Sequence, residues 1–125
     1  MAVSRETVLY YDPAGGERAA ALKAILVQMG ARIKNVPPEA VGQTVGCLLG
    51  RKGYDARENP EAPVLAEPVL VLDGFTDKRL EILLREMKKH GVSIAYKAIV
   101  TETNIGWLFH QLYDELAREH AAMGR

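Results

Sequence analysis

The polar side chains best suited to bind a ligand lie where a predicted strand meets a predicted helix. Lys97 lies in an apolar segment with strand character, and Thr101, Thr103 and Asn104 follow it. In α/β folds ligands usually bind at the carboxyl ends of strands, where the next helix offers free N–H groups with partial positive charge. Hydroxyl and amide groups there, with Lys97 as a counter-charge, would suit a small anionic ligand. Residues of these types more often have a structural role, in which Thr103 and Asn104 cap the helix and Lys97 points into solvent.

Trp107 indicates a contact surface and not a reaction. The apolar residues of the last predicted helix recur at helical spacing, at Ile105, Leu108, Phe109, Leu112 and Leu116. A step of about 100° per residue puts Trp107 on the opposite face, beside Asp114 and Arg118. Tryptophan and arginine are enriched among interface hot spots. Either this face binds a partner, or the connector or a neighbouring helix covers the tryptophan.

Two aspartates follow the first predicted strand of each half of the chain. Asp12 precedes Pro13, and Asp73 precedes Gly74. If the two strands are neighbours, the carboxylates could converge, and such a pair can bind a divalent cation or share a proton. Aspartate is also a preferred turn residue, which explains the same positions without chemistry.

The remaining patterns are weaker. Gly15-Gly16 lacks the full glycine spacing or the Lys-Ser/Thr pair of a phosphate loop. His110 and Asp114 are four residues apart, but no third metal ligand accompanies them. The lone Cys47 excludes an intramolecular disulfide and a cysteine-cluster metal site. We therefore predict no metal site, no cofactor and no catalytic residue.

The elements that must position these residues repeat along the chain. A shift of 61 residues without a gap brings like residues together: Glu6, Val8, Leu9, Asp12, Arg18, Leu22, Gly30 and Ile33 fall on Glu67, Val69, Leu70, Asp73, Arg79, Leu83, Gly91 and Ile94. The matches mark a strand that ends in aspartate, a helix, a glycine where the helix stops, and an isoleucine that opens the next strand. We predict an α/β fold in which a duplicated β-α-β-α unit packs as one compact domain with a four-stranded sheet.

The repeats are expected at about residues 6–50 and 68–123 of a single domain over 1–125, with a proline-rich connector at 51–67. Apolar periodicity predicts strands at 8–11, 31–36, 69–72 and 94–100. It predicts helices at 17–29, around 41–49, at 77–90 with Thr76 as N-cap, and from 103 or 104 to 123. Right-handed crossovers should make the two strands of each repeat parallel, but the pattern leaves open how the halves join.

Three glycines stand four residues apart in the second helix, at Gly42, Gly46 and Gly50. An interior glycine costs about 1 kcal/mol relative to alanine, so the spacing needs a reason. Small residues at this spacing let another backbone approach closely. We expect tight internal packing against this seam, in preference to a groove for a partner.

The composition of the chain argues against some classes of binding partner. Lys plus Arg equals Asp plus Glu at 16 each, so the net charge of zero gives no general attraction to nucleic acid or anionic lipid. No apolar run approaches the roughly twenty residues of a membrane span, and the first residues lack the pattern of a signal peptide. With one cysteine, these features lead us to expect a cytoplasmic protein that does not enter membranes.

The second half resembles a small bacterial family known as domain of unknown function 3783. The resemblance is carried by the segments at 69–75 (VLVLDGF), 91–94 (GVSI) and 97–104 (KAIVTETN), with Trp107 following. Gln43-Thr44-Val45-Gly46 in the first half is also similar to a segment of such chains. The resemblance implies a family without an assigned activity.

Two functions remain open. The first is a non-catalytic binding or interaction module, regulatory in role, that uses the junction from Lys97 to Trp107 and the outer face of the last helix. The second is a small enzyme or a metabolite- or phosphate-binding domain with a site at the strand ends, formed by Asp12, Asp73, Thr101 and Asn104. A homodimer is compatible with either, because the edge strands of a four-stranded sheet can pair.

Overall fold

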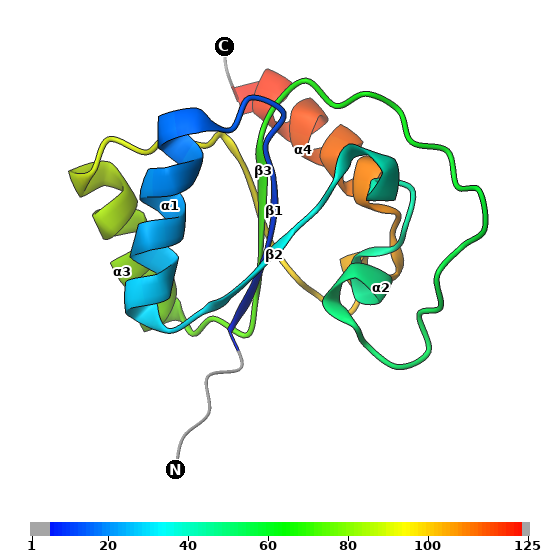
Figure 1. Ribbon diagram of the computed structural model, residues 1–125, viewed down its shortest axis with the longest axis horizontal. Helices are drawn as coiled ribbons and strands as arrows, with labels where there is room; N and C mark the ends of the chain where they lie inside the picture. Colours follow the sequence, from blue (N-terminus) through cyan, green and yellow to red (C-terminus); the bar gives the residue numbers. More distant parts are fainter. Residues whose placement is uncertain (1–5, 124–125) are drawn as a thin grey trace.

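The computed structural model describes residues 6–123 and places both repeats in one sheet (Figure 1). The elements, in chain order, are β1 (Thr7–Tyr11), α1 (Gly16–Met29), β2 (Arg32–Asn35), the 3₁₀ turn η1 (Pro38–Ala40), α2 (Val45–Leu49), β3 (Val69–Asp73), α3 (Asp77–Lys89), β4 (Tyr96–Ile99), the 3₁₀ turn η2 (Asn104–Gly106) and α4 (Phe109–Met123). The order strand, helix, strand, helix thus occurs twice. The predicted α/β class and four-stranded sheet are confirmed.

The sheet has the order β2-β1-β3-β4. β1 pairs parallel with β2, and β3 pairs parallel with β4, as the crossover rule predicts for each repeat. The halves join through β1 and β3, which run antiparallel at the centre of the sheet. The carboxyl ends of β1 and β3 therefore lie at opposite ends of the sheet.

The central pairing has a local two-fold symmetry. Leu9 pairs with Val71, and Tyr10 pairs with Leu70. Under the 61-residue shift Leu9 corresponds to Leu70 and Tyr10 to Val71, so the two pairs are equivalent. The starts of α2 and α4 meet in the same reciprocal way, because Val45 N–H donates to the Trp107 carbonyl and Phe109 N–H donates to the Gln43 carbonyl, both at 2.9 Å.

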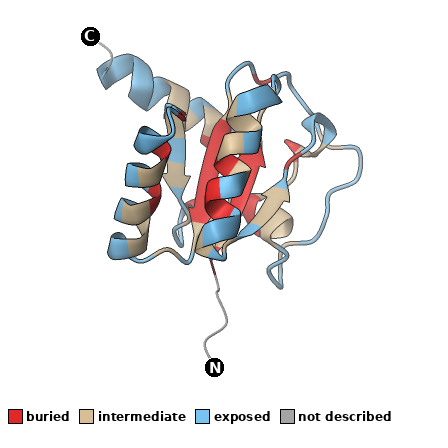
Figure 2. Cartoon of the chain, turned by 60° about the vertical axis from the view of Figure 1, so that its left-hand side comes forward, coloured by how far each residue is buried: buried red, intermediate tan, exposed pale blue. Residues whose placement is uncertain are grey.

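Two layers of helices cover the sheet. α1 and α3 lie on one face, and α2, α4 and the connector lie on the other (Figure 1). The central strands are buried on both faces, and Figure 2 shows them behind the half-exposed helix α1. Alternate residues of β1 and β3 supply the two cores. The α1/α3 core takes Val8, Tyr10, Leu70 and Leu72, and the α2/α4 core takes Leu9, Tyr11, Val69 and Val71.

Several predicted boundaries are confirmed by their capping contacts. Gly30 ends α1 in the left-handed conformation, with φ of 79°. The Thr76 side chain accepts a hydrogen bond from the Arg79 N–H at the start of α3. Residues 51–67 form no helix or strand, as expected of a connector.

Three predicted starts are wrong. The second helix begins at Val45 and not near Val41, so Gly42 lies in the turn before it. β4 begins at Tyr96 and not at Ile94, because the second crossover is two residues longer: Val8 pairs with Ile33, whereas its counterpart Val69 pairs with Tyr96. Ile94 is instead buried in the α1/α3 core just before the strand. The last helix begins at Phe109 and not at residue 103 or 104, because the chain first makes the separate turn η2.

The glycine seam receives the connector, as expected for internal packing. A Cβ atom on Gly46 would lie 2.5 Å from the Tyr54 ring, and one on Gly42 would collide with Pro60 and the Glu61 carbonyl. Gly50 serves differently, as the left-handed residue that ends α2 at φ of 79°. The seam therefore holds the connector against the α2 side of the fold.

Candidate functional site

The five residues predicted to form one binding junction are divided among three places. Lys97 lies on the face of β4 that is turned toward α3, and its Nζ donates to the Ile94 carbonyl. Thr101 and Asn104 lie in the turn after β4, and Thr103 is exposed there without a capping hydrogen bond from its side chain. Trp107 lies on the other side of the sheet, against the α2/α4 core. The residues expected to hold an anion therefore do not meet.

The Thr101–Asn104 turn uses its own polar groups. Asn104 Oδ1 accepts from the Thr101 N–H at 2.8 Å, and Thr101 Oγ1 accepts from the Asn104 N–H at 3.0 Å. Asn104 Nδ2 donates to the Ile99 carbonyl at 3.0 Å, and the residue is only 8% exposed. These bonds end β4 and start η2. The expected helix cap at Thr103 and Asn104 is not formed, because the Thr103 side chain makes no capping hydrogen bond and α4 begins only at Phe109.

Trp107 lines a hollow of about 440 Å³ on the outer side of α4. Gln111, Asp114, Glu115 and Arg118 complete it, so Asp114 and Arg118 line the same hollow as the tryptophan. Helical spacing is not the reason, because Trp107 is extended and lies before α4, which begins at Phe109. We call these five residues the α4 surface. Trp107 is partly buried against the core while it lines the hollow, and an Arg118–Glu115 ion pair of 2.8 Å lies at its rim. The α4 surface thus joins a fixed aromatic ring to charges of both signs.

Asp12 and Asp73 do not form a common pocket, which corrects the alternative site. β1 and β3 are neighbours, but they are antiparallel, and Thr7 pairs with Asp73. Asp12 therefore lies beyond one end of the central pair and Asp73 at the other. Each carboxylate has its own arginine: Arg18 binds Asp12 at 2.8 Å, and Arg51 binds Asp73 at 2.5 Å.

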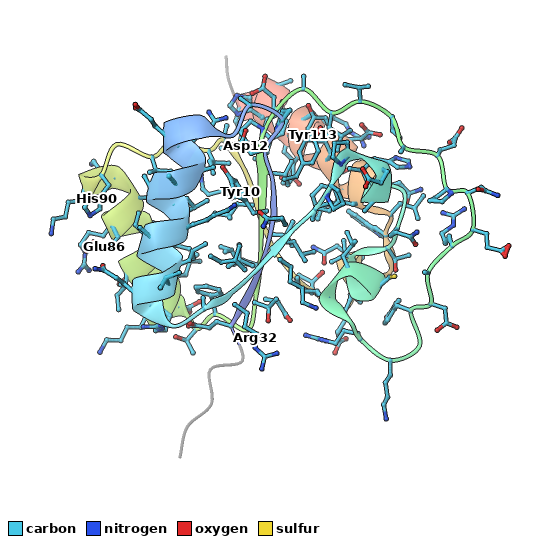
Figure 3. The ribbon with its side chains drawn as sticks, viewed as in Figure 1. Tyr10, Asp12, Arg32, Glu86, His90 and Tyr113 are labelled. Atoms are coloured by element: carbon cyan, nitrogen blue, oxygen red, sulfur yellow. The ribbon has the colours of Figure 1, made fainter. Side chains whose placement is uncertain are left out.

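Asp12 is the centre of a compact polar cluster at the end of β1, where Figure 3 labels it beside Tyr10. Its carboxylate accepts from Arg18 through two nitrogens, from the Tyr10 hydroxyl, and from the N–H groups of Ala14 and Gly15. Burial acts to raise the pKa of Asp12, but these hydrogen bonds outweigh it and hold the pKa well below its usual range. Burial, with the hydrogen bond to Asp12, raises the pKa of Tyr10 to about 12. The cluster fixes the turn into α1.

The sequence did not predict an equivalent cluster at the other end of the central strands. Arg79 holds Glu6 through two hydrogen bonds of 2.7 Å and also donates to the Met29 carbonyl. The Glu6 side chain is only 9% exposed. The available signal was the repeat itself, because Arg18 and Arg79 occupy matched positions.

Metal ligands are not clustered in residues 6–123, where no three His, Cys, Asp or Glu side chains could hold an ion together. His120 packs its ring against Tyr96, with centroids 5.6 Å apart. Over the same range no helix combines the length and the apolar character needed to cross a bilayer.

A second surface, which sequence reasoning missed, lies between α3 and the edge strand β4. Two adjoining hollows of about 320 and 290 Å³ share Leu84 and Lys97 as lining residues. Leu84 is 39% exposed and Ile99 is 45% exposed, although both are large apolar residues. We call this surface the β4 groove. Its signal in the sequence is the four-residue spacing of Leu80 and Leu84 in the predicted helix at 77–90.

The family comparison agrees with the resemblance seen in the sequence. Residues 68–123, from just before β3 to the end of α4, match the family model described as Domain of unknown function (DUF3783). No curated protein and no solved structure matches the chain. The matched range carries Trp107, the rest of the α4 surface and the β4 groove. Residues 68–123 are therefore similar to the DUF3783 family.

Proposed function

We propose that this protein is a non-catalytic interaction module, regulatory in role, which binds a protein partner through the α4 surface. The partner would insert an apolar group beside Trp107 and place polar groups near Asp114 and Arg118. The proposal treats residues 1–125 as a single domain in the cytoplasm. The lone Cys47 suits a reducing compartment.

The observation that carries the proposal is the position of Trp107. The main chain of Trp107 is fixed, because its backbone N–H donates to the Asn104 carbonyl at 3.0 Å and its backbone carbonyl accepts from the Val45 N–H at 2.9 Å. The side chain packs against the α2/α4 core and still lines a hollow of about 440 Å³. A rigid aromatic group loses little conformational entropy on binding, and tryptophan and arginine dominate interface hot spots.

The enzyme alternative has less support. It needs Asp12, Asp73, Thr101 and Asn104 at one site, and the antiparallel central strands separate the two aspartates. Thr101 and Asn104 satisfy each other. Asp12 is enclosed by Arg18, Tyr10 and the turn N–H groups, so its carboxylate is already fully used.

The first experiment is quantitative affinity capture with charge-reversal variants. Arg118→Glu changes the α4 surface at a side chain that is 71% exposed, so the fold should survive. Arg85→Glu is the matched control, because Arg85 is an exposed arginine on α3, outside the α4 surface. We expect a partner retained by the wild type and by Arg85→Glu and lost by Arg118→Glu. Equal retention by the two variants would contradict the proposal.

The chain offers a second readout on the purified partner. Trp107 is the single tryptophan, so the intrinsic tryptophan emission of the protein reports on the α4 surface alone. Binding at this surface should shift the emission to shorter wavelength as water leaves the ring. A tryptophan-free fragment of the partner keeps the signal specific. An unchanged emission spectrum at saturation would place the interface elsewhere.

A further inference from the structure

The β4 groove presents unused backbone hydrogen-bonding groups. The Val100 N–H donates to the Leu72 carbonyl of β3 at 2.9 Å. Because backbone groups alternate in direction along a strand, the N–H and C=O groups of Lys97 and Ile99 point away from β3, toward the open edge. Asn104 Nδ2 takes one lone pair of the Ile99 carbonyl and leaves the other. The edge can therefore pair with a short extended segment.

The two edges of the sheet differ in how they are protected. β2 carries Arg32 and Lys34, and charged residues of this kind discourage pairing with another chain. β4 carries one charged residue, Lys97, whose Nζ donates to the Ile94 carbonyl of its own chain. It also carries Ile99, which is 45% exposed beside the 39% exposed Leu84 of α3. An exposed apolar rim next to an open strand edge is the arrangement that extended peptides use when they add a strand to a sheet.

The hollows of the β4 groove select for side chains of a particular chemistry. One has an apolar lining that includes Leu80 and Ile99, and the other includes Ile94. Lys88 and Lys97 lie among the lining residues, which include no carboxylate. The groove thus complements apolar side chains together with a negative charge.

We propose that the β4 groove binds an extended peptide segment that adds to β4 as an antiparallel fifth strand, with two apolar side chains in the hollows and a carboxylate beside Lys88. Antiparallel pairing is slightly more stable per residue than parallel pairing. Every second residue of the peptide would face the groove, at a spacing of about 7 Å. Lys88 and Ile94 line the hollow nearer the start of β4, so in an antiparallel peptide the acidic residue follows the apolar ones.

This site is separate from the α4 surface. Lys97 and Ile99 face the α1/α3 side of the sheet, whereas α4 covers the opposite face. Peptide addition at β4 and partner binding at Trp107 can therefore succeed or fail independently.

The test uses a designed peptide on the full chain. The probe is the acetylated heptapeptide Thr-Ile-Thr-Ile-Thr-Glu-Thr, whose apolar and acidic side chains share one face. Fluorescence anisotropy measures its affinity, and amide chemical shifts locate it. We expect saturable binding, with the largest shifts at the Lys97 and Ile99 amides. The peptide with the reverse order should bind about tenfold more weakly.

Three variants, one of them a control, make the outcome decisive. Lys88→Glu should weaken the probe about tenfold or more, and Lys89→Glu, an exposed neighbour outside the groove lining, should leave it unchanged. Ile99→Pro should abolish binding, because it removes an outward N–H and spares the bonds to β3. A thermal melt of each variant confirms its fold.

Four results would overturn the proposal. The first three are no saturable binding, equal effects of Lys88→Glu and Lys89→Glu, and shifts confined to another surface. A sedimentation mass of two chains that falls to one with Ile99→Pro would assign the edge to a second copy and also overturn it.

Discussion

Both ends of the central strand pair are held by an arginine on a nearly buried carboxylate. Arg18 binds Asp12, whose side chain is 3% exposed, and Arg79 binds Glu6, whose side chain is 9% exposed. The 61-residue shift matches the two arginines and also includes Asp12 and Glu6, but it does not predict which carboxylate each arginine contacts. Which carboxylate each arginine binds depends on the antiparallel pairing of β1 with β3. This pairing places Glu6 beside the end of β3, and Asp73 forms its ion pair with Arg51 instead. The sequence repeat predicts which side chains recur, and the antiparallel pairing of β1 with β3 determines which residues they contact.

The lowered pKa of Asp12 predicts a pH-dependent contribution to stability. Arg18, Tyr10 and the turn N–H groups favour the carboxylate in the folded state, so its folded pKa lies below the unfolded value of about 3.9. The stabilisation is therefore complete above the unfolded pKa and is lost as the pH falls toward the folded pKa. Asp12→Asn should lower the free energy of unfolding by about 1–3 kcal/mol at pH 7. The difference from the wild type should shrink below about pH 4.

Urea denaturation from pH 7 to pH 2.5 measures this difference. Asp55→Asn is the matched control, because Asp55 is exposed on the connector. A constant gap between Asp12→Asn and the wild type across this range would show that the carboxylate charge is not what stabilises the turn.

At the scale of elements, the connector acts as a packed part of the fold. Tyr54 lies against Gly46, and the Pro60–Glu61 segment lies against Gly42. The Tyr11 hydroxyl donates to the Leu65 carbonyl at 2.7 Å and fixes its later part. The glycine spacing predicted close packing in advance, but only the structure identifies the connector as the packing partner. A segment without regular structure leaves no periodic signal of what it contacts.

Gly46→Ala tests this packing, because its effect on the free energy of unfolding should have opposite signs in the wild type and in a Tyr54→Ala background. Alanine is favoured over glycine in a helix by about 1 kcal/mol, but its Cβ would lie 2.5 Å from the Tyr54 ring. Overpacking of this kind costs about 1–3 kcal/mol, so Gly46→Ala should destabilise the wild type. In a Tyr54→Ala background the same substitution should stabilise the protein. Denaturation of the four proteins of the cycle measures both effects, and destabilisation of equal size in both backgrounds would exclude the contact as its cause.

Some boundaries of helices and strands could be predicted from the sequence, and others could not. Predicted helix ends at Gly30 and Thr76 were correct, because one residue type sets each cap. The starts of β4 and α4 were not, because both depend on contacts outside the local pattern. Asn104 binds back to Ile99 and Thr101 and creates a turn where the periodicity predicted a helix. The same turn separates Lys97 from Trp107 and divides the predicted junction.

The whole molecule is organised about its local two-fold symmetry. In the central pair, residues whose numbers sum to 80 are opposite each other, and the 61-residue shift maps the four pairs from Val8–Leu72 to Tyr11–Val69 onto one another. The two halves therefore contribute equivalent faces to the sheet. Each half alone would leave its central strand unpaired along one edge and would expose part of both cores. The family match falls on one such half, residues 68–123.

The second half in isolation should therefore form a symmetric homodimer. A fragment of residues 62–125 lacks β1, the strand that pairs with β3. The β3 of a second copy could take its place, because Val71 corresponds to Tyr10 under the 61-residue shift. Leu70 would then pair with Val71 of that copy in place of Tyr10. A free monomer of this length would expose Val69 and Val71, so folding should depend on protein concentration. Sedimentation and circular dichroism should report a folded dimer that unfolds on dilution. Val71→Lys should prevent the dimer, because it places a charge in the buried centre of the sheet, whereas Lys78→Ala on the exposed face of α3 should not. A folded monomer would show that the halves do not depend on each other for their core.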